Sequence, residues 1–499
     1  MTGISSLRRE ISELEDAVSQ QTALIFNMNR KLQSLQHELR KTATYPVCDL
    51  PPEILSEIFL YGLPPTLIPT EAIDPFDPER PSAPLLFLQI CRAWRRAALA
   101  TPELWKSLAI CMDETPDRRS SHMLDIFAER ARALPLNLAL WAMQGSDRGG
   151  SQADEDAFSH CLERNAHRIG SLALELCENE AEVFNREQLD FPNLRHLNIN
   201  LEHGSGHWSE NNQPLRCFRN TPLLTSLILH IFLTYPRFLD LPWTQLTKLE
   251  TRGMPLDASL EAVRLCPNLT DLTLSIDWMP TWTESFGPPL THLFIQRLRL
   301  TEHPEAPEFD DEDEVFALSC FTLPALETLE IWPTHRMGEE VFTDFIGRSS
   351  PPLRNLSFKT AQGYALPEWL SMYPLIGLKI TSLEIEHPPR AFCKLFFDTL
   401  ASNIDLLLAL ESLSMSCDED NAHYGLEYFM ERAGHAITVR RQQQHSGTPW
   451  PLRSLRLVSS GRWGLRFDLS PNIKAIRVLQ GLKQAGIEVY AGTARQRVV

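Results

Sequence analysis

The chain has 499 residues, 43% of them hydrophobic, which is enough for a large core in about two to four structural units. Its 47 Lys and Arg against 64 Asp and Glu leave a net charge of −17, which argues against nucleic acid as the main partner. Ten scattered cysteines form no CxxC pair, so we expect buried reduced thiols. The N-terminus is charged from residue 8, and no run reaches the ~18 apolar residues that span a bilayer. We therefore expect an intracellular protein, in the cytoplasm or nucleus, that binds no membrane.

Residues 4–39 carry apolar side chains at alternating spacings of three and four. One heptad position is mainly β-branched and the other is mainly leucine, which favours a parallel two-stranded coiled coil. We expect residues 1–42 to form a coiled-coil helix and the chain to form a homodimer through residues 4–39. The alternative is one amphipathic helix folded back onto the chain. The two sets are Ile4, Ile11, Val18, Ile25, Leu32 and Leu39, and Leu7, Leu14, Gln21, Met28 and Leu35.

Residues 50–64, LPPEILSEIFLYGLP, predict a short helix that begins at the proline pair and ends at Gly62. Ile54, Leu55, Ile58 and Phe59 fall on one face of it at helical spacing. The following segment, up to residue 84, holds too many prolines for regular structure and predicts a surface insertion. A second helical pattern follows in LLFLQICRAWRRAALATPELW, where a new short helix starts after Thr101.

The stretches LPPEILSEIF and CRAWRRAALATPELW resemble the F-box, a three-helix module, and the proline-rich insertion is similar to those of F-box-like proteins of mushroom-forming fungi. This gives an F-box-like domain at residues 45–108, with the insertion at 64–84 as its departure from the usual pattern. The resemblance implies that the module docks on a Skp-family adaptor and, through it, on a cullin. The adaptor-binding residues that it implies are Leu50, Pro51, Ile54, Leu55, Ile58, Phe59, Leu88, Cys91, Trp94, Leu104 and Trp105.

The rest of the chain repeats a six-residue phrase of the form LxxLxL, with conservative apolar exchanges, between residues 171 and 458. Most intervals between copies fit leucine-rich repeats of about 20–29 residues. We therefore expect an α/β fold over residues 109–499: a leucine-rich-repeat solenoid, in which one strand per repeat builds an open curved parallel sheet with helices or loops on the convex side. The alternative is an ordinary mixed sheet with leucine-rich strands. The second leucines of the phrases are Leu172, Leu197, Leu227, Leu249, Leu272, Leu293, Leu329, Leu356, Leu383, Leu413 and Leu455.

Helices are predicted between some of these strands, at residues 258–266, 339–347 and 394–404. A further helix from Ile473 to Leu482, followed by a strand at 487–489, would close the end of the solenoid.

No motif for catalysis is present: the sequence lacks GxxxxGK[ST], HExxH, GxSxG and a GxGxxG after a strand. HGSGH at 203–207 has no obvious third metal ligand, so we expect a solvated loop. The acidic run at 308–314 lacks the glycine and distal glutamate of a calcium loop and is interpreted as a solvated insertion, with docking of a basic partner as the alternative. Trp278 and Trp282 are interpreted as packing residues. We therefore predict no catalytic residue, no metal and no cofactor.

In a repeat of this form, the residues between the leucines point to the concave face, because strand side chains alternate. An F-box combined with leucine-rich repeats resembles the substrate receptors of SCF-type ubiquitin ligases, which implies a non-catalytic subunit whose solenoid binds a protein substrate. The alternatives are an interaction scaffold that engages no cullin, and a small-molecule sensor. The predicted substrate-binding residues are His196, Asn198, Lys248, Glu250, Arg252, Asp271, His292, Phe294, Glu330, Trp332, Lys359, Glu384 and Arg456.

Overall fold

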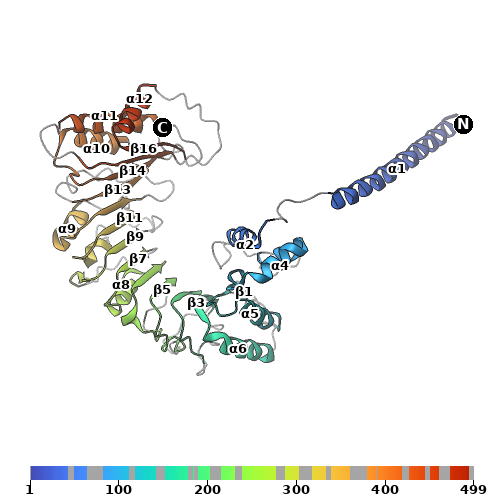
Figure 1. Ribbon diagram of the computed structural model, residues 1–499, viewed down its shortest axis with the longest axis horizontal. Helices are drawn as coiled ribbons and strands as arrows, with labels where there is room; N and C mark the ends of the chain where they lie inside the picture. Colours follow the sequence, from blue (N-terminus) through green and yellow to red (C-terminus); the bar gives the residue numbers. More distant parts are fainter. Residues whose placement is uncertain are drawn as a thin grey trace. The chain divides into compact units, whose positions relative to one another are not determined.

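A computed structural model gives the fold of the chain (Figure 1). It divides into two compact units: the first holds residues 2–63 and 83–104, and the second runs from Trp105 to Val499. The structure describes residues 2–42, 50–63, 83–111, 118–141, 152–177, 184, 189–202, 215–230, 236, 239–276, 287–302, 317–332, 339–359, 379–388, 390–417, 426–443, 450–459, 473–493 and 499.

The described residues of the first unit form four α-helices: α1 (Thr2–Thr42), α2 (Pro52–Tyr61), α3 (Phe87–Ile90) and α4 (Arg92–Ala100). A short 3-10 helix, η2 (Pro102–Trp105), starts in this unit and ends in the next. Helix α2 starts after Pro51 because a proline is tolerated in the first turn, and the amide of Gly62 closes its end by donating to the carbonyls of Ile58 and Phe59. The helices predicted at 4–39 and 50–64 are therefore confirmed as helices.

The second unit is built on one long parallel sheet, so the predicted α/β class is confirmed. Within the described residues, this sheet has 14 strands, which lie side by side in chain order, an arrangement compatible with a solenoid. Two further strands, β8 and β10, form a separate pair. The strands of the sheet are β1 (Ser107–Cys111), β2 (Leu136–Trp141), β3 (Ile169–Cys177), β4 (His196–Glu202), β5 (Ser226–His230), β6 (Lys248–Arg252), β7 (Asp271–Ile276), β9 (Arg297–Glu302), β11 (Thr328–Trp332), β12 (Asn355–Phe358), β13 (Ser382–Glu386), β14 (Ser412–Cys417), β15 (Ser454–Ser459) and β16 (Glu488–Thr493).

One buried residue of each strand aligns with its counterpart on the next and forms a column across the sheet. Each of these residues is at most 5% exposed. A one-residue slip of any strand would turn its leucines to the other face, so burial fixes the register. The column consists of Leu108, Leu138, Leu172, Leu197, Leu227, Leu249, Leu272, Leu298, Leu329, Leu356, Leu383, Leu413, Leu455 and Val489.

Helices cover one side of this sheet, where the leucine column lies. The Phe342 ring of α9 packs on the Phe358 ring of β12 with centroids 6.0 Å apart, and Ser259 of α8 lies 3.4 Å from Thr251 of β6. The opposite side of β1 and β2 buries Ala109, Ala139 and Trp141, and from β4 onward we call this opposite side the open face. The remaining elements are α5 (Arg118–Arg130), α6 (Gln152–Ala166), α8 (Leu256–Leu265), α9 (Glu339–Ser349), α10 (Arg390–Ser402), α11 (Leu426–Gln443), α12 (Ile473–Gln484), η5 (Trp243–Gln245), η6 (Ala317–Cys320), β8 (Leu290–Thr291) and β10 (Phe321–Thr322).

The strand predicted at residues 289–296 is wrong. Leu290 and Thr291 pair with β10 outside the large sheet, and the strand of this repeat is β9, with Leu298 in the column. Leu293, the expected column residue, is 61% exposed. The phrase LxxLxL also fits residues 295–300, and only this second match lies in the sheet.

The helices predicted at 258–266, 339–347, 394–404 and 473–482 are confirmed as α8, α9, α10 and α12, and the strand predicted at 487–489 as β16. Sequence reasoning missed β1, β2, α5, α6 and α11. Strand β1 spans the boundary predicted between residues 108 and 109. Most of the proline-rich insertion, HGSGH, the acidic run, Trp278 and Trp282 lie outside the described residues.

Candidate interaction surfaces

Helix α2 divides its apolar side chains between two faces. Leu55 and Phe59 are buried, and the Phe59 ring lies 4.4 Å from that of Phe87 in α3 and 4.9 Å from that of Trp94 in α4. Aromatic rings at these separations pack favourably. Phe59 is therefore the core of what we call the three-helix module, residues 50–63 and 83–104.

Polar contacts join the helices of this module. The hydroxyl oxygens of Ser56 on α2 and Thr101 after α4 are 2.7 Å apart. The Cys91 sulfur accepts a hydrogen bond from the Trp94 amide at 3.4 Å, so it occupies the N-cap position of α4. Because these contacts fix how the helices pack, they also fix which residues the module presents to solvent.

The outer face of α2 is apolar and exposed. Ile54 is 48% exposed, Ile58 43% and Tyr61 89%, and their spacing of four and three residues places them along one side of the helix. Large exposed apolar side chains also occur on and beside α3 and α4, at Leu86, Ile90 and Leu99. Gathered apolar side chains of this kind mark interaction sites.

The predicted adaptor-binding residues fall into two groups. Leu55, Phe59, Leu104 and Trp105 are buried, and Trp105 packs in the second unit against Phe127, with ring centroids 5.1 Å apart. Leu55, Phe59 and Leu104, which belong to the three-helix module, can support its surface from beneath but cannot form it. The others are half-buried or exposed: Leu50, Pro51, Ile54, Ile58, Leu88, Cys91 and Trp94. Sequence reasoning missed Tyr61 and Ile90, although their helical spacing from Ile54 and Leu86 was a usable signal.

Most of the predicted substrate-binding residues lie on the open face. They alternate along the strands with the buried leucines, and none of them is buried. They are His196, Asn198, Lys248, Glu250, Arg252, Asp271, Glu330, Trp332, Lys359, Glu384 and Arg456. Arg297 and Arg299 on β9 belong to the same face and were missed, because the strand was predicted one phrase too early.

His292 and Phe294 are not on the open face. His292 is buried in the turn before β9, where its Nε2 lies 2.9 Å from the Cys266 carbonyl oxygen and its Nδ1 accepts from the Phe294 amide. Both ring nitrogens of His292 are therefore used within the fold. Phe294 is 54% exposed and precedes the strand.

Ion pairs cross the open face between neighbouring strands. Arg297 pairs with Asp271 at 2.9 Å and Arg299 with Glu330 at 3.0 Å, while Lys359 Nζ lies 3.3 Å from Glu330 and 3.6 Å from Glu386. Burial disfavours the charge on Lys359, yet the surrounding glutamates outweigh burial and raise its pKa. Lys359 therefore stays charged.

Strands β4 and β5 present an uncharged part of the open face. Burial, with a smaller effect of Arg252, lowers the pKa of His230 to about 4, and burial also lowers the pKa of His196. Both imidazoles are therefore neutral at pH 7. His230 Nε2 and Asn198 Oδ1 are buried and have no hydrogen-bond partner in the part of the chain that the structure describes.

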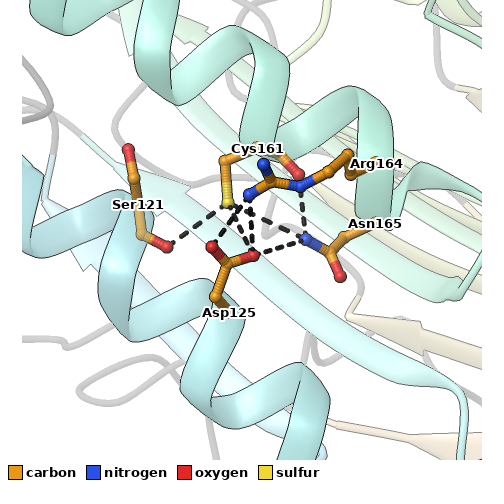
Figure 2. Close-up of polar contacts among 5 residues, drawn as sticks. All are labelled: Ser121, Asp125, Cys161, Arg164 and Asn165. Atoms are coloured by element: carbon orange, nitrogen blue, oxygen red, sulfur yellow. Dashed lines mark hydrogen bonds and ion pairs between the residues drawn. The ribbon is translucent and has the colours of Figure 1, made fainter.

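A thiol, a carboxylate and a guanidinium meet between α5 and α6 (Figure 2). The Cys161 sulfur lies 3.4 Å from Asp125 Oδ1, and Arg164 Nη2 lies 2.8 Å from Asp125 Oδ2. Burial and the Asp125 charge raise the pKa of Cys161 to about 11. At pH 7 the thiol is therefore protonated, and the cluster ties the two helices together.

The described residues bring no three metal-ligating side chains together, and none of the described helices combines the length and apolar character needed to cross a bilayer. No protein-family model and no curated protein matches the chain.

Proposed function

We propose that the chain is the substrate-recognition subunit of an SCF-type ubiquitin ligase. Its three-helix module would be an F-box that docks a Skp-family adaptor, and its sheet would be a leucine-rich-repeat solenoid that binds a protein substrate on the open face. The chain would contribute proximity, because it would hold the substrate near a conjugating enzyme. It would supply no covalent chemistry of its own.

The observation that supports adaptor docking most directly is the division of α2 into two faces. Phe59 is fully buried in the module, so its packing needs no partner chain, whereas Ile54 and Ile58 remain 48% and 43% exposed. Fully burying one exposed side chain of this kind contributes about 1.5–3 kcal/mol, and each half-exposed isoleucine has roughly half of that to gain. An adaptor that covers both isoleucines would therefore gain much of its affinity there.

The test replaces Ile54 and Ile58 together by Ser in the full-length chain and measures capture of a Skp-family adaptor. We expect adaptor affinity to fall by about a hundredfold, because two apolar anchors are lost, while the circular dichroism spectrum stays unchanged. Leu395→Ser is the matched control, since Leu395 is 49% exposed on α10 in the other unit. Unchanged adaptor capture by the double variant would overturn the docking proposal.

A scaffold that binds the adaptor without a cullin is the competing function. It is favoured if cullin is absent from a purification of the full-length chain that retains the adaptor, and the ligase proposal then fails.

We also propose that α1 pairs with α1 of a second copy in a coiled coil. The seam side chains Leu14, Val18, Ile25, Met28, Leu32, Leu35 and Leu39 are between 53% and 62% exposed. An isolated chain would leave this apolar seam in water, whereas a second copy carries the same seam and matches it heptad by heptad. Deleting residues 1–42 should halve the native mass measured by light scattering and leave adaptor binding intact. An unchanged mass would overturn the homodimer.

A further inference from the structure

We propose that the open face of β6 to β13 binds an extended protein segment that carries an acidic residue near one end and a basic residue near the other. The inference rests on the proposed function in that the open face is where a substrate would bind, and it names the chemistry of that substrate.

The two halves of this face differ in charge. On β6, β7 and β9, four cations face two carboxylates, which leaves an excess of two positive charges; the residues are Lys248, Arg252, Arg297, Arg299, Glu250 and Asp271. On β11 to β13, Lys359 faces three carboxylates, which leaves an excess of two negative charges; these are Glu330, Glu384 and Glu386. The face is therefore bipolar within a chain that is strongly acidic overall.

Uncharged strands flank the bipolar region and set its limits. On one side the open-face residues in the paired part of β4 and β5 are neutral at pH 7, and on the other β14 presents serines. These residues are His196, Asn198, Asn200, Ser226, Ile228 and His230, and Ser412, Ser414 and Ser416. The bipolar region thus covers six consecutive strands of the sheet.

One charge at each end remains available to a partner. Lys248 is exposed on β6 and makes no ion pair with the described residues. Glu384 on β13 receives a hydrogen bond from the Ser357 hydroxyl at 3.2 Å and likewise has no cation within 4 Å in the described residues. The charges between them are engaged in the pairs Arg297–Asp271, Arg299–Glu330 and Lys359–Glu330.

The spacing of the strands sets the length of the segment. From β6 to β13 the sheet advances by five strand steps, each of about 4.8 Å, or roughly 24 Å in all. An extended chain covers about 3.3–3.4 Å per residue, so a segment of about seven residues spans this distance.

An aromatic anchor lies within the acidic half. The half-buried Trp332 ring has Lys359 Nζ 5.7 Å from its centroid, which holds the ring in place. Tryptophans so placed are frequent hot spots of protein interfaces. A nucleic acid is the poorer fit, because its uniform negative charge would be repelled by the acidic half.

The first test selects a phage library of random twelve-residue peptides on the full-length chain. We expect the enriched peptides to carry an acidic and a basic residue about five to seven positions apart. The proposal is overturned if no peptide is enriched, or if the enriched peptides carry charge of one sign or none.

The second test measures how tightly the most enriched peptide, labelled with a fluorophore, binds charge-reversed variants. Lys248→Glu and Glu384→Lys should each weaken binding by about five- to tenfold. Arg264→Glu on α8 and Glu340→Lys on α9 make the same charge changes at exposed sites on the helix side and should stay within about twofold of the original chain. Equal losses in controls and face variants, or no loss at the face, would overturn the proposal.

These tests are separable from that of the proposed function. Adaptor capture is measured on the same samples and depends on the three-helix module. A chain that captures adaptor but selects no bipolar peptide would contradict this inference alone, whereas bipolar peptide binding without adaptor capture would contradict the ligase function alone.

Discussion

The helix pairs α5/α6 and α10/α11 are both held together by arginines, in opposite ways. Between α10 and α11, the Arg440 side chain is fully buried and donates to the carbonyls of Leu400, Asn403, Ile404 and Leu406. Between α5 and α6, Arg164 is 64% exposed and pairs with the carboxylate of Asp125. A cation can therefore be buried on backbone carbonyls, here one of the last turn of α10 and three of the turn that follows it, where partners within the helix run out; the Asp405 charge adds to this by favouring the charged form of Arg440.

A third arginine lies between these extremes. The half-buried Arg168 donates to the carbonyls of Ala128, Arg132 and Leu134 at the end of α5. Arg132 has a left-handed backbone with φ of 54°, and Leu407 after α10 has φ of 52°. At α5, which ends at Arg130, the left-handed Arg132 turns the chain away from the helix and leaves carbonyls that Arg168 binds, whereas Leu407 lies five residues beyond the end of α10. The three arginines therefore form a series that runs from buried to exposed.

Arg440→Met should have the largest effect. The substitution keeps much of the volume but removes four hydrogen bonds, and of the four carbonyls only that of Asn403 keeps a further donor among the described residues, the Leu406 amide, so we expect a loss of about 3–5 kcal/mol in the stability of the C-terminal helices. Hydrogen exchange followed by mass spectrometry should show faster exchange in α10 and α11. Arg432→Met on the same helix is the control, because Arg432 makes a partly exposed pair with Asp398. Similar losses at both positions would remove the distinction between buried and exposed arginines.

Arg168→Met should have an intermediate effect of about 1–2 kcal/mol, because water can reach part of the group and replace some of the lost hydrogen bonds. The change should speed hydrogen exchange at the end of α5 and leave α10 unaffected. A loss as large as that of Arg440→Met would show that the number of carbonyls, and not burial, sets the contribution.

The raised pKa of the Cys161 thiol, which lies between α5 and α6, makes the stability of the fold depend on pH. Its pKa is raised from 9.0 to about 11 by burial and Asp125, so the unfolded chain loses this proton at a lower pH than the folded chain. The stability that Cys161 contributes is therefore present below pH 9 and is lost as the pH rises from 9 to 11. We expect a loss of about 1 kcal/mol by pH 10, allowing for partial solvent screening. Urea unfolding of Cys161→Ala beside the original chain, at pH 8 and pH 10, measures this loss of stability. If both chains lose the same stability between the two pH values, the loss does not come from Cys161.

None of these arginine contacts could be read from the sequence, whereas the sheet could. The leucine column follows from a repeated phrase, because a strand that buries one face must place leucine at every second position. The phrase failed only where two overlapping copies competed, at Leu293 and Leu298. Strands β1 and β2 were missed because SLAIC and LNLALW do not contain it. The burial of Arg440 depends on where α10 ends in space, which no local pattern encodes.

The surfaces were predicted less completely than the sheet, for a related reason. Helical spacing places Ile54, Leu55, Ile58 and Phe59 on one broad apolar face of α2. Which half of that face is buried depends on the positions of Phe87 and Trp94, which come from the far side of the proline-rich segment. The sequence therefore identifies the helix, and only packing separates its core from its exposed side.

Arg164→Met should have the smallest effect and so fixes the lower end of the series. Arg164 and Asp125 are 64% and 46% exposed, and ion pairs in such positions contribute about 0–1 kcal/mol, less at high salt. We expect the urea midpoint to shift only slightly. The shift should vanish in about 0.5–1 M NaCl, because the screening length there is roughly 3–4 Å. The same substitution also removes a positive neighbour of Cys161, and that neighbour lowers the pKa of the thiol. A large, salt-independent loss of stability would mean that the Asp125 cluster acts as a buried network, and the contrast between the two helix pairs would then fail.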